Sequence, residues 1–477
     1  MKVYLSRWSN DKLKTVLIIS WLATVISSFF GVAVTMGKLP GIGELFPFRV
    51  FLPITVLIYL IWIIREKYNP WKEASYILRF CYVFCCILVV YGGLSLFWAM
   101  DIEFTFRRWF NLCIDLCFFF LALELGKDRR IFLYTIRCTM PTIIFEIVMG
   151  IYEVYSGGIL FLHRDTFHSV TFFSRMCYWP RGTIGNPNDY SMTLVLTLAL
   201  FLLYWVCRRH EEKCDWIPVA FIAPVYFLTC ASGARLCMAA LLIVLSGFGM
   251  YALTLEKKKR WILITTILLL GFVVFGCNYE HLTTDTRNLL EPFVVSAEAT
   301  SIEPEQVVPL SDGSSFMDEF LSVNSETGEI RANQEHSAGI RLYLLMHALD
   351  CFVQSNGMGV GLGNTEQLAI LSETNKSGIW TIHCFLARMT ADFGIWFLIP
   401  LLLLVFELLR TCFVNMKQAL KGKRVADTMM WVLYLTTLIS YPIASTAPSD
   451  AQDSLVMWLF LAGIILFPMH MQKKEGE

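Results

Sequence analysis

The sequence predicts an all-α membrane protein, a polytopic bundle of about twelve transmembrane helices with one large external loop that contains short helices. Hydrophobic residues make up 56% of the 477 residues and charged residues only 16%, which is too apolar for a surface that faces water. Apolar runs of about twenty residues recur along the chain, and such runs satisfy their backbone hydrogen bonds as helices inside lipid. Basic residues gather in alternate loops, as the positive-inside rule requires.

The expected spans follow one another along the chain. Their predicted centres are Thr24, Thr55, Leu88, Phe118, Ile143, Leu198, Val225, Leu245, Leu269, Leu401, Thr437 and Leu461. The first run follows several basic residues, as a signal peptide does, but it is about twenty residues long and lacks an Ala-x-Ala cleavage site. We therefore expect it to remain in the protein as the first span.

The basic loops predict the sidedness and the domain organisation. Clusters such as Lys257 to Arg260 place alternate loops, and with them both termini, in the cytoplasm. We expect residues 1–279 to form spans one to nine, residues 280–382 a large extracytoplasmic loop, and residues 383–477 spans ten to twelve. Apolar residues at helical spacing from Ser337 to Val353 predict a helix that lies along the membrane surface or caps the bundle.

Charge and cysteine usage exclude several classes of protein. The numbers of basic and acidic residues are equal, at 39 each, so the net charge gives no reason to expect a nucleic-acid partner. Most of the 15 cysteines lie inside apolar runs, where a thiol behaves as a small hydrophobic group, and they form no zinc-binding pattern. No second ligand cluster accompanies His163, Asp165 and His168, so the sequence predicts no metal site.

Cations on the predicted outer side are almost all arginines, whereas the lysines gather on the inner side. Guanidinium groups bind phosphate oxygens in pairs, so an external diphosphate is the ligand that this pattern favours. Several of these arginines are equally expected to pair with acidic residues or to reach lipid headgroups. They are Arg107, Arg108, Arg164, Arg175, Arg181, Arg235, Arg287, Arg331, Arg341 and Arg388.

Three of these arginines stand in contexts typical of a site. Arg181 opens a Gly-rich and Asn-Pro-Asn turn, with Asn186 and Asn188, that leads into the sixth span, and a helix N-terminus favours anions. Arg235 begins the eighth span, where a charge by default faces a polar cavity. Arg341 precedes alternating glycines around Gly361, which allow the backbone to approach a ligand or another helix closely.

His383 is the candidate for proton transfer. It stands at the expected outer start of the tenth span, and an imidazole can take up and return a proton near neutral pH. Asp392 and Gly394 follow on the same helix. From position alone, a histidine that caps or packs the helix start is the alternative.

Taken together, these sequence motifs resemble those of the O-antigen ligase and O-antigen polymerase superfamily of bacterial surface-polysaccharide assembly. The resemblance covers most of the chain and includes the long outer loop between the ninth and tenth spans. It rests on Arg181-Gly182-Thr183-Ile184-Gly185-Asn186-Pro187-Asn188, on Ser232-Gly233-Ala234-Arg235, on Arg341 with its glycines, and on His383 with Asp392 and Gly394. The chain departs from the family pattern at Cys384, where the family has Asn, and at Asp392, where it has Glu.

The resemblance implies a metal-independent, inverting glycosyl transfer, without a cofactor, at the outer face of a bacterial cytoplasmic membrane. The donor would be a glycan on undecaprenyl diphosphate, the acceptor a saccharide hydroxyl, and the further partners the lipid bilayer and other polysaccharide-assembly proteins. Arg181, Arg235 and Arg341 would hold the departing diphosphate, and His383 would act as general base. Asn186, Asn188, Gly361 and Asp392 would support the site.

The sequence leaves three alternatives open. A ligase would differ from a polymerase only in its acceptor, a lipid or wall anchor in place of the next lipid-linked repeat, and we favour a polymerase because nothing marks a lipid A core acceptor. A lipid-linked oligosaccharide flippase or other transporter would share the helix count, but two similar halves and charges at the bilayer midplane are typical of that class. A sensor or scaffold without chemistry is the third alternative.

Overall fold

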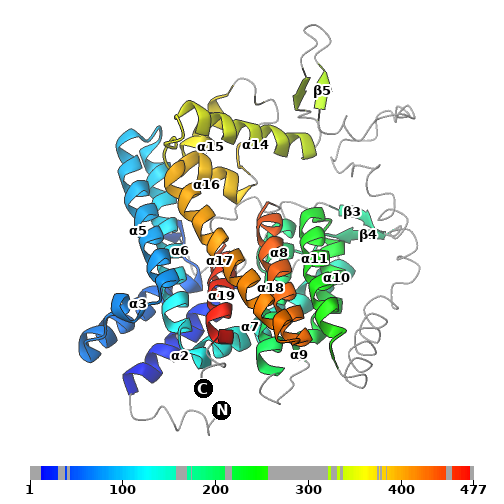
Figure 1. The fold of residues 1–477 in the computed structure, drawn as a ribbon. Coiled ribbons are helices and arrows are strands. Elements are labelled where there is room, and N and C mark those ends of the chain that lie inside the picture. The colour runs from blue at the N-terminus through cyan, green and yellow to red at the C-terminus, as the bar shows by residue number, and fades with distance from the viewer. Residues whose placement is uncertain are drawn as a thin grey trace.

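The structure is a computed structural model of the chain. It describes residues 12–30, 38–39, 43–156, 169–172, 175–209, 217–255, 321–323, 330–332, 337–372, 375, 379–382, 384–446 and 454–472. Within these ranges the protein is a helical bundle, and short strands pair as antiparallel hairpins outside it (Figure 1). The strands are β1 (Lys38–Leu39) with β2 (Gly43–Glu44), β3 (Ser169–Phe172) with β4 (Arg175–Tyr178), and β5 (Leu321–Val323) with β6 (Ile330–Ala332).

The helices follow the apolar runs of the sequence. They are α2 (Lys12–Ser27), α3 (Pro47–Glu66), α4 (Pro70–Glu73), α5 (Tyr76–Leu94) with the 3₁₀ turn η1 (Ser95–Trp98), α6 (Ile102–Gly126), α7 (Arg129–Ser156), α8 (Pro187–Arg209), α9 (Ile217–Ala220), α10 (Ile222–Ala231), α11 (Arg235–Ala252), α14 (Ser337–Gln354), α15 (Asn364–Leu371), α16 (Phe385–Phe393), α17 (Ile395–Lys421), α18 (Val425–Ala444) and α19 (Leu455–Gln472).

Polar residues at the helix ends explain where several helices begin. The Asp101 carboxylate accepts hydrogen bonds from the backbone N–H groups of Glu103 and Phe104 at 3.0 Å and so caps the start of α6. Proline stands at the first position of α3, where a missing N–H costs nothing. The end of α6 at Gly126 is separated by only two residues from the start of α7 at Arg129, and these two helices pack against each other.

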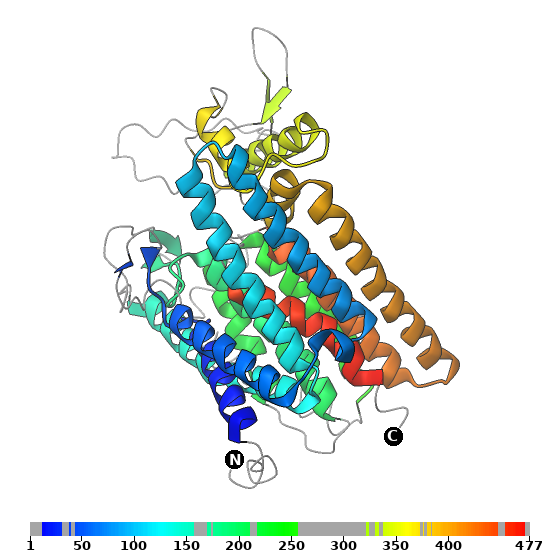
Figure 2. The same cartoon turned by 90° about the vertical axis from the view of Figure 1, so that its left-hand side faces the viewer.

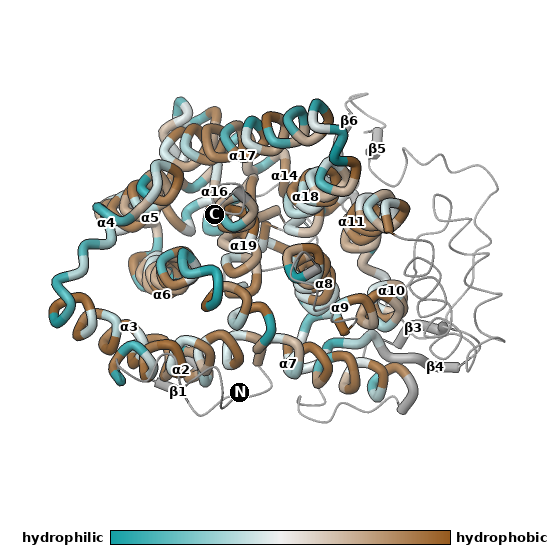
Figure 3. Tube along the Cα trace, turned by 60° about the horizontal axis from the view of Figure 1, so that its bottom comes forward, coloured by the Kyte–Doolittle hydropathy of each residue, from teal (hydrophilic) through white to brown (hydrophobic). Residues whose placement is uncertain are grey.

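The bundle has a buried centre and an apolar surface. The whole spanning part of α8 is buried, whereas only 22% of the corresponding parts of α3 and α17 is buried. These two outer helices expose large apolar side chains such as Ile64 and Phe406, as helices that face lipid do. Hydrophobic residues run along the bundle helices, and hydrophilic residues gather near turns such as the one around α4 (Figure 3).

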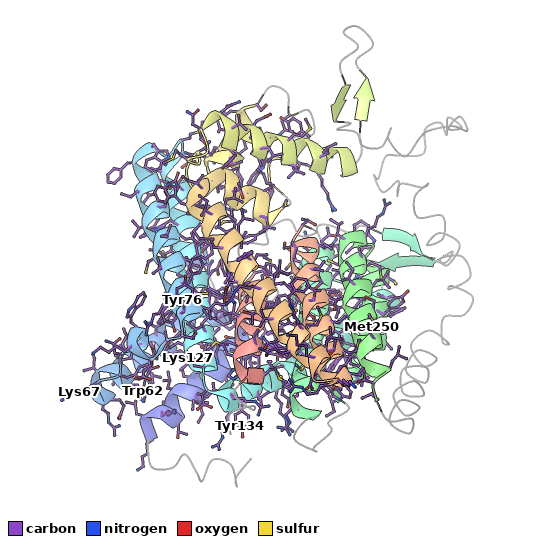
Figure 4. All side chains as sticks on the ribbon, viewed as in Figure 1. Trp62, Lys67, Tyr76, Lys127, Tyr134 and Met250 are labelled. Atoms are coloured by element: carbon purple, nitrogen blue, oxygen red, sulfur yellow. The ribbon has the colours of Figure 1, made fainter. Side chains whose placement is uncertain are left out.

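A group of three helices, α14, α15 and α16, lies across one end of the bundle (Figures 1 and 2). We call this end the α14 end. The first described helix, α2, begins and the last, α19, ends on the opposite side of the molecule, and Lys67 and Lys127 lie on that side too (Figure 4). The positive-inside rule predicts that this opposite side is cytoplasmic and that the α14 end is outside.

The described helices agree with much of the sequence-based prediction. Every predicted centre except Leu269, which lies outside the described residues, falls within a helix. Seven described helices are long and apolar enough to cross a membrane, and the segments Ile217–Ala231 and Leu455–Met471 are shorter apolar helices. The fold is that of a polytopic helical membrane protein, and the count of twelve spans stays a prediction. Helix α14 confirms the helix predicted from Ser337 to Val353.

Candidate functional site

Arg235 and Arg341 come together although more than a hundred residues separate them in the sequence. Arg235 is the exposed first residue of α11, and Arg341 is a partly buried residue of α14. Burial lowers the pKa of Arg341; the Cys237 thiol opposes this effect, and the nearby positive charge of Arg235 adds to it. Neither guanidinium has a carboxylate partner among the described residues. We call these two residues the arginine pair.

The start of α11 is held against the start of α8. Gly233 adopts a positive φ of 68°, which a glycine takes without strain and which ends α10 in a tight turn. In that turn the Ser232 hydroxyl forms a hydrogen bond with the Ser191 hydroxyl of α8. Two residues into α11, the Cys237 thiol lies 3.9 Å from the backbone oxygen of Asn188. The Ser232-to-Arg235 box and the Asn-Pro-Asn box therefore meet in space.

Asp189, in the first turn of α8, lies in this same region. The Cys237 thiol interacts electrostatically with both Asp189 and Arg341. The region thus contains Asp189, Cys237 and Arg341, which come from three different helices. Sequence reasoning missed Asp189, although it directly follows the Asn-Pro-Asn box.

The Arg181 turn is fixed by two carboxylates of α7. The Glu153 Oε2 atom accepts hydrogen bonds from the backbone N–H of Arg181 at 2.6 Å and of Gly182 at 2.9 Å. The Glu146 carboxylate accepts from the backbone N–H of Thr183 at 3.0 Å and from the Thr183 hydroxyl. A Cβ atom on residue 182 would lie 2.1 Å from Glu146 Oε2, so only glycine fits there.

Asn186 completes the turn into α8. Its side-chain oxygen accepts a hydrogen bond from the backbone N–H of Asn188 at 2.8 Å, and its backbone oxygen accepts from Tyr190 at 2.9 Å. The amides of residues 181–183 and 188 thus already donate to protein oxygens. An anion at this turn would therefore be held by side chains, above all by that of Arg181. Burial lowers the pKa of Arg181, and the nearby Glu153 charge opposes this effect.

Gly361 and its neighbouring glycines approach another part of the backbone. The N–H groups of Val360 and Gly361 donate to the backbone oxygens of Ala391 and Asp392 at 3.0 Å and 2.9 Å. A Cβ atom on Gly361, where φ is 102°, would lie 2.5 Å from Trp98 Nε1. Of the two readings that the sequence allowed, the described contacts are those of close packing against other elements of the protein.

Asp392 caps helix α15. Its carboxylate accepts hydrogen bonds from the N–H groups of Gly363 at 3.1 Å and of Thr365 at 3.3 Å, and from the Thr365 hydroxyl at 2.5 Å. Burial raises the pKa of Asp392 to about 6, against the opposing effects of the Arg388 charge and these hydrogen bonds. Asp392 thus joins α15 to α16 and to the glycine-rich segment.

A buried charge network lies beside Asp392. The Glu366 carboxylate pairs with Arg108 at 3.1 Å and with Arg388 at 3.3 Å, and the Glu366 side chain is 0% exposed. We call these three residues the Glu366 network. Arg107 pairs with Glu103 on the surface of α6. Arg107, Arg108 and Arg388 are all predicted to be external, and each has a carboxylate partner. Pairing with acidic residues is the alternative to anion binding that the sequence left open.

His383 lies outside the described residues, as do Arg164, Arg287, His163, Asp165 and His168. The residue before it, Ile382, packs with Ala348 and Cys351 of α14 and Ala391 of α16 in a small apolar cluster. Ile382 is thereby packed against α14, the helix that carries Arg341.

Some polar residues of this region were missed by the sequence reasoning. Glu146 and Glu153 stand in an apolar helix, and a carboxylate inside a predicted span is a signal that could have identified them. His347 of α14 lies with Nε2 3.1 Å from the backbone oxygen of Thr365 and stacks on Tyr343. Among the described residues, no group of three or more His, Cys, Asp or Glu is arranged to hold a metal ion.

Chemically, the arginine pair is suited to an anion with several oxygens. Two guanidinium groups offer parallel N–H donors that match phosphate geometry, and burial of one of them strengthens its interaction with a charged ligand.

Comparison with known proteins gives a relative that is similar over most of the chain. No family model matches the chain. The chain is similar to the teichuronic acid biosynthesis protein TuaE of Bacillus subtilis (strain 168), with 20% identity over 442 residues that cover 89% of this chain and 79% of the relative. The similarity thus extends over most of the chain.

Proposed function

We propose that this protein is a bacterial membrane glycosyltransferase that acts in polysaccharide biosynthesis. Its donor would be a glycan linked through diphosphate to undecaprenol, and its acceptor a saccharide hydroxyl at the outer face of the cytoplasmic membrane. We favour a polymerase, in which the acceptor is another lipid-linked repeat. The observation that carries the proposal is the arginine pair, two neighbouring guanidinium groups without a carboxylate partner among the described residues at the predicted outer end.

The arginine pair would act on the leaving group. When the bond between the anomeric carbon and the phosphate oxygen breaks, negative charge grows on the lipid diphosphate, and fixed cations lower the energy of that state. In this proposal the guanidinium groups of Arg235, Arg341 and Arg181 supply the charge that a metal ion supplies in other enzymes. Their fixed position on helix starts and on α14 means that little reorganisation is needed.

The acceptor side of the reaction would use His383. The acceptor hydroxyl forms the new bond to the anomeric carbon, its proton passes to the imidazole, and the electron pair of the broken bond leaves with the diphosphate. A single displacement of this kind inverts the configuration at the anomeric carbon. The similarity to a protein named for teichuronic acid biosynthesis supports a polysaccharide as the product.

The experiment is an elongation assay with purified protein in nanodiscs and lipid-linked repeat units. We expect longer glycans with the wild type, and a loss of about a hundredfold or more in His383→Ala and Arg341→Ala while the folded protein remains. Arg107→Ala is the matched control, because Arg107 is an arginine of the same end that pairs with Glu103. Unchanged elongation in both site variants would refute the assignment, and lipid movement without new glycosidic bonds would favour a flippase.

A further inference from the structure

Two carboxylates of α7 are buried against the Arg181 turn. The side chains of Glu146 and Glu153 are 0% and 1% exposed, and they stand seven residues apart, so they share one face of the helix. A carboxylate buried within a membrane span is costly, and such residues usually have a task. Both face the Arg181 turn, as their hydrogen bonds show.

Together the two carboxylates accept hydrogen bonds from three consecutive backbone N–H groups, those of residues 181–183. Successive N–H groups in a turn form a concave site that binds anions such as phosphate. In this protein, side chains from its own helix α7 fill that site. The turn is therefore an anion site whose resident ligand is part of the protein.

Glu153 differs from Glu146 in two respects. Its carboxylate lies close enough to the Arg181 guanidinium to raise the pKa of that group, whereas the Glu146 carboxylate has no such effect. Its second oxygen, Oε1, is buried and accepts no hydrogen bond from any described residue. Two N–H donors and a neighbouring guanidinium stabilise the charged form of this carboxylate against the effect of burial. Glu153 thus places a negative charge beside Arg181. Only one of its two oxygens, Oε2, also accepts hydrogen bonds from the turn.

We propose that Glu153 is a positioning residue and resident counter-ion of the diphosphate site: it holds Arg181 through the backbone and weakens the attraction of this arginine for diphosphate. The inference rests on the proposed function, because it assigns Arg181 to the donor site. The physical reason is that the lipid diphosphate must be released after each transfer. A lipid diphosphate held by three arginines without a counter-charge would leave slowly after each transfer, and a fixed carboxylate nearby offsets part of that attraction.

Binding of inorganic pyrophosphate to purified protein in nanodiscs, at low salt, tests the inference. Glu153→Gln keeps an oxygen that accepts from both amides and removes the charge, so we expect binding roughly three- to tenfold tighter than in the wild type. Glu153→Ala also releases the turn, and we expect it to bind no more tightly than the wild type. Glu146→Gln is the matched control on the same helix and turn, with binding within about twofold of the wild type.

The outcomes separate this inference from the proposed function. Loss of binding in Arg341→Ala together with wild-type affinity in Glu153→Gln would overturn the counter-ion role alone. Equal tightening in Glu153→Gln and Glu146→Gln would also overturn it, because the effect would then not be specific to the charge beside Arg181. Absence of pyrophosphate binding in the wild type would overturn both proposals. Thermal unfolding of each variant checks folding, and if Glu153→Ala does not fold, the two Gln variants decide.

Discussion

The α14 end contains two groups of arginines with opposite surroundings. In the Glu366 network, Arg108 and Arg388 share one fully buried carboxylate. In the arginine pair, Arg235 and Arg341 have each other's positive charge as a neighbour and no carboxylate partner among the described residues. A buried ion pair joins elements of the protein, whereas a cation such as the half-buried Arg341, without a carboxylate partner among the described residues, is unfavourable unless an anion binds it. In our proposal, the lack of a carboxylate partner, rather than position on the outer side, distinguishes the arginines that bind the diphosphate.

The largest expected effect comes from a substitution in the Glu366 network, the group in which the arginines have a carboxylate partner. Glu366→Ala would leave Arg108 and Arg388 buried without their carboxylate, and removal of one partner of a buried pair costs about 3–5 kcal/mol. We expect little folded protein by size-exclusion chromatography and a strongly lowered unfolding temperature. Glu407→Ala on α17, which breaks an exposed pair with Arg410, is the control and should unfold as the wild type does. A normal unfolding temperature in Glu366→Ala would mean that the network does not hold the α14 end together.

The second prediction concerns the uncompensated group. We expect Arg235→Ala and Arg341→Ala each to lower the rate of elongation by about a hundredfold, without lowering the unfolding temperature. The double variant should lose little more than the more severe single variant, because two groups that hold one ligand act as a unit. The measurement is a double-mutant cycle on the elongation rate. Losses that multiply would indicate two independent sites and would separate the two arginines.

The sequence predicts the helices well because their cause is local. A run of about twenty apolar residues must form a helix in lipid whatever it packs against, and the predicted centres within the described residues fall on helices. The compensation of charges is not local. Glu366 lies 258 residues after Arg108, so no spacing rule could separate Arg108 from Arg341 in advance.

The glycine-rich segment illustrates the same limit. Alternating glycines indicate a close approach, and Gly361 does lie close to Trp98 and Asp392, but the sequence cannot say whether the partner is a ligand or another part of the protein. The two carboxylates of α7 are the opposite case. Glu146 and Glu153 interrupt an apolar span, which is a readable signal, and only their partners in the Arg181 turn required the structure.

The third prediction uses the cap of α15, which belongs to the compensated region. Burial raises the pKa of Asp392 from its ordinary value of 3.8 to about 6. Between these pH values the folded protein retains a proton that the unfolded chain has released, so the free energy of unfolding falls as the pH rises from about 4 to 6. The full change is at most about 3 kcal/mol. The unfolding temperature measured across this range should show the slope in the wild type and lose it in Asp392→Asn.

A matched variant sharpens this prediction. Asp350 is an exposed aspartate of α14, and Asp350→Asn should keep the wild-type slope. If stability instead rises from pH 4 to 6 and Asp392→Asn removes that rise, then the hydrogen bonds from Gly363 and Thr365 and the charge of Arg388 outweigh burial. That result would place Asp392 among the fully compensated charges of this end.

The smallest expected effect is that of Arg107→Ala, which tests the comparison at its weakest point. Arg107 is next to Arg108 in the sequence and is predicted to be on the same side of the membrane as Arg341, but its side chain is 54% exposed and pairs with Glu103 one turn away. A solvent-exposed pair of this kind contributes less than about 0.5 kcal/mol. We therefore expect unchanged unfolding and unchanged elongation. A large loss of elongation would show that an arginine with a carboxylate partner can still bind the donor, and the rule that separates the two groups would then fail.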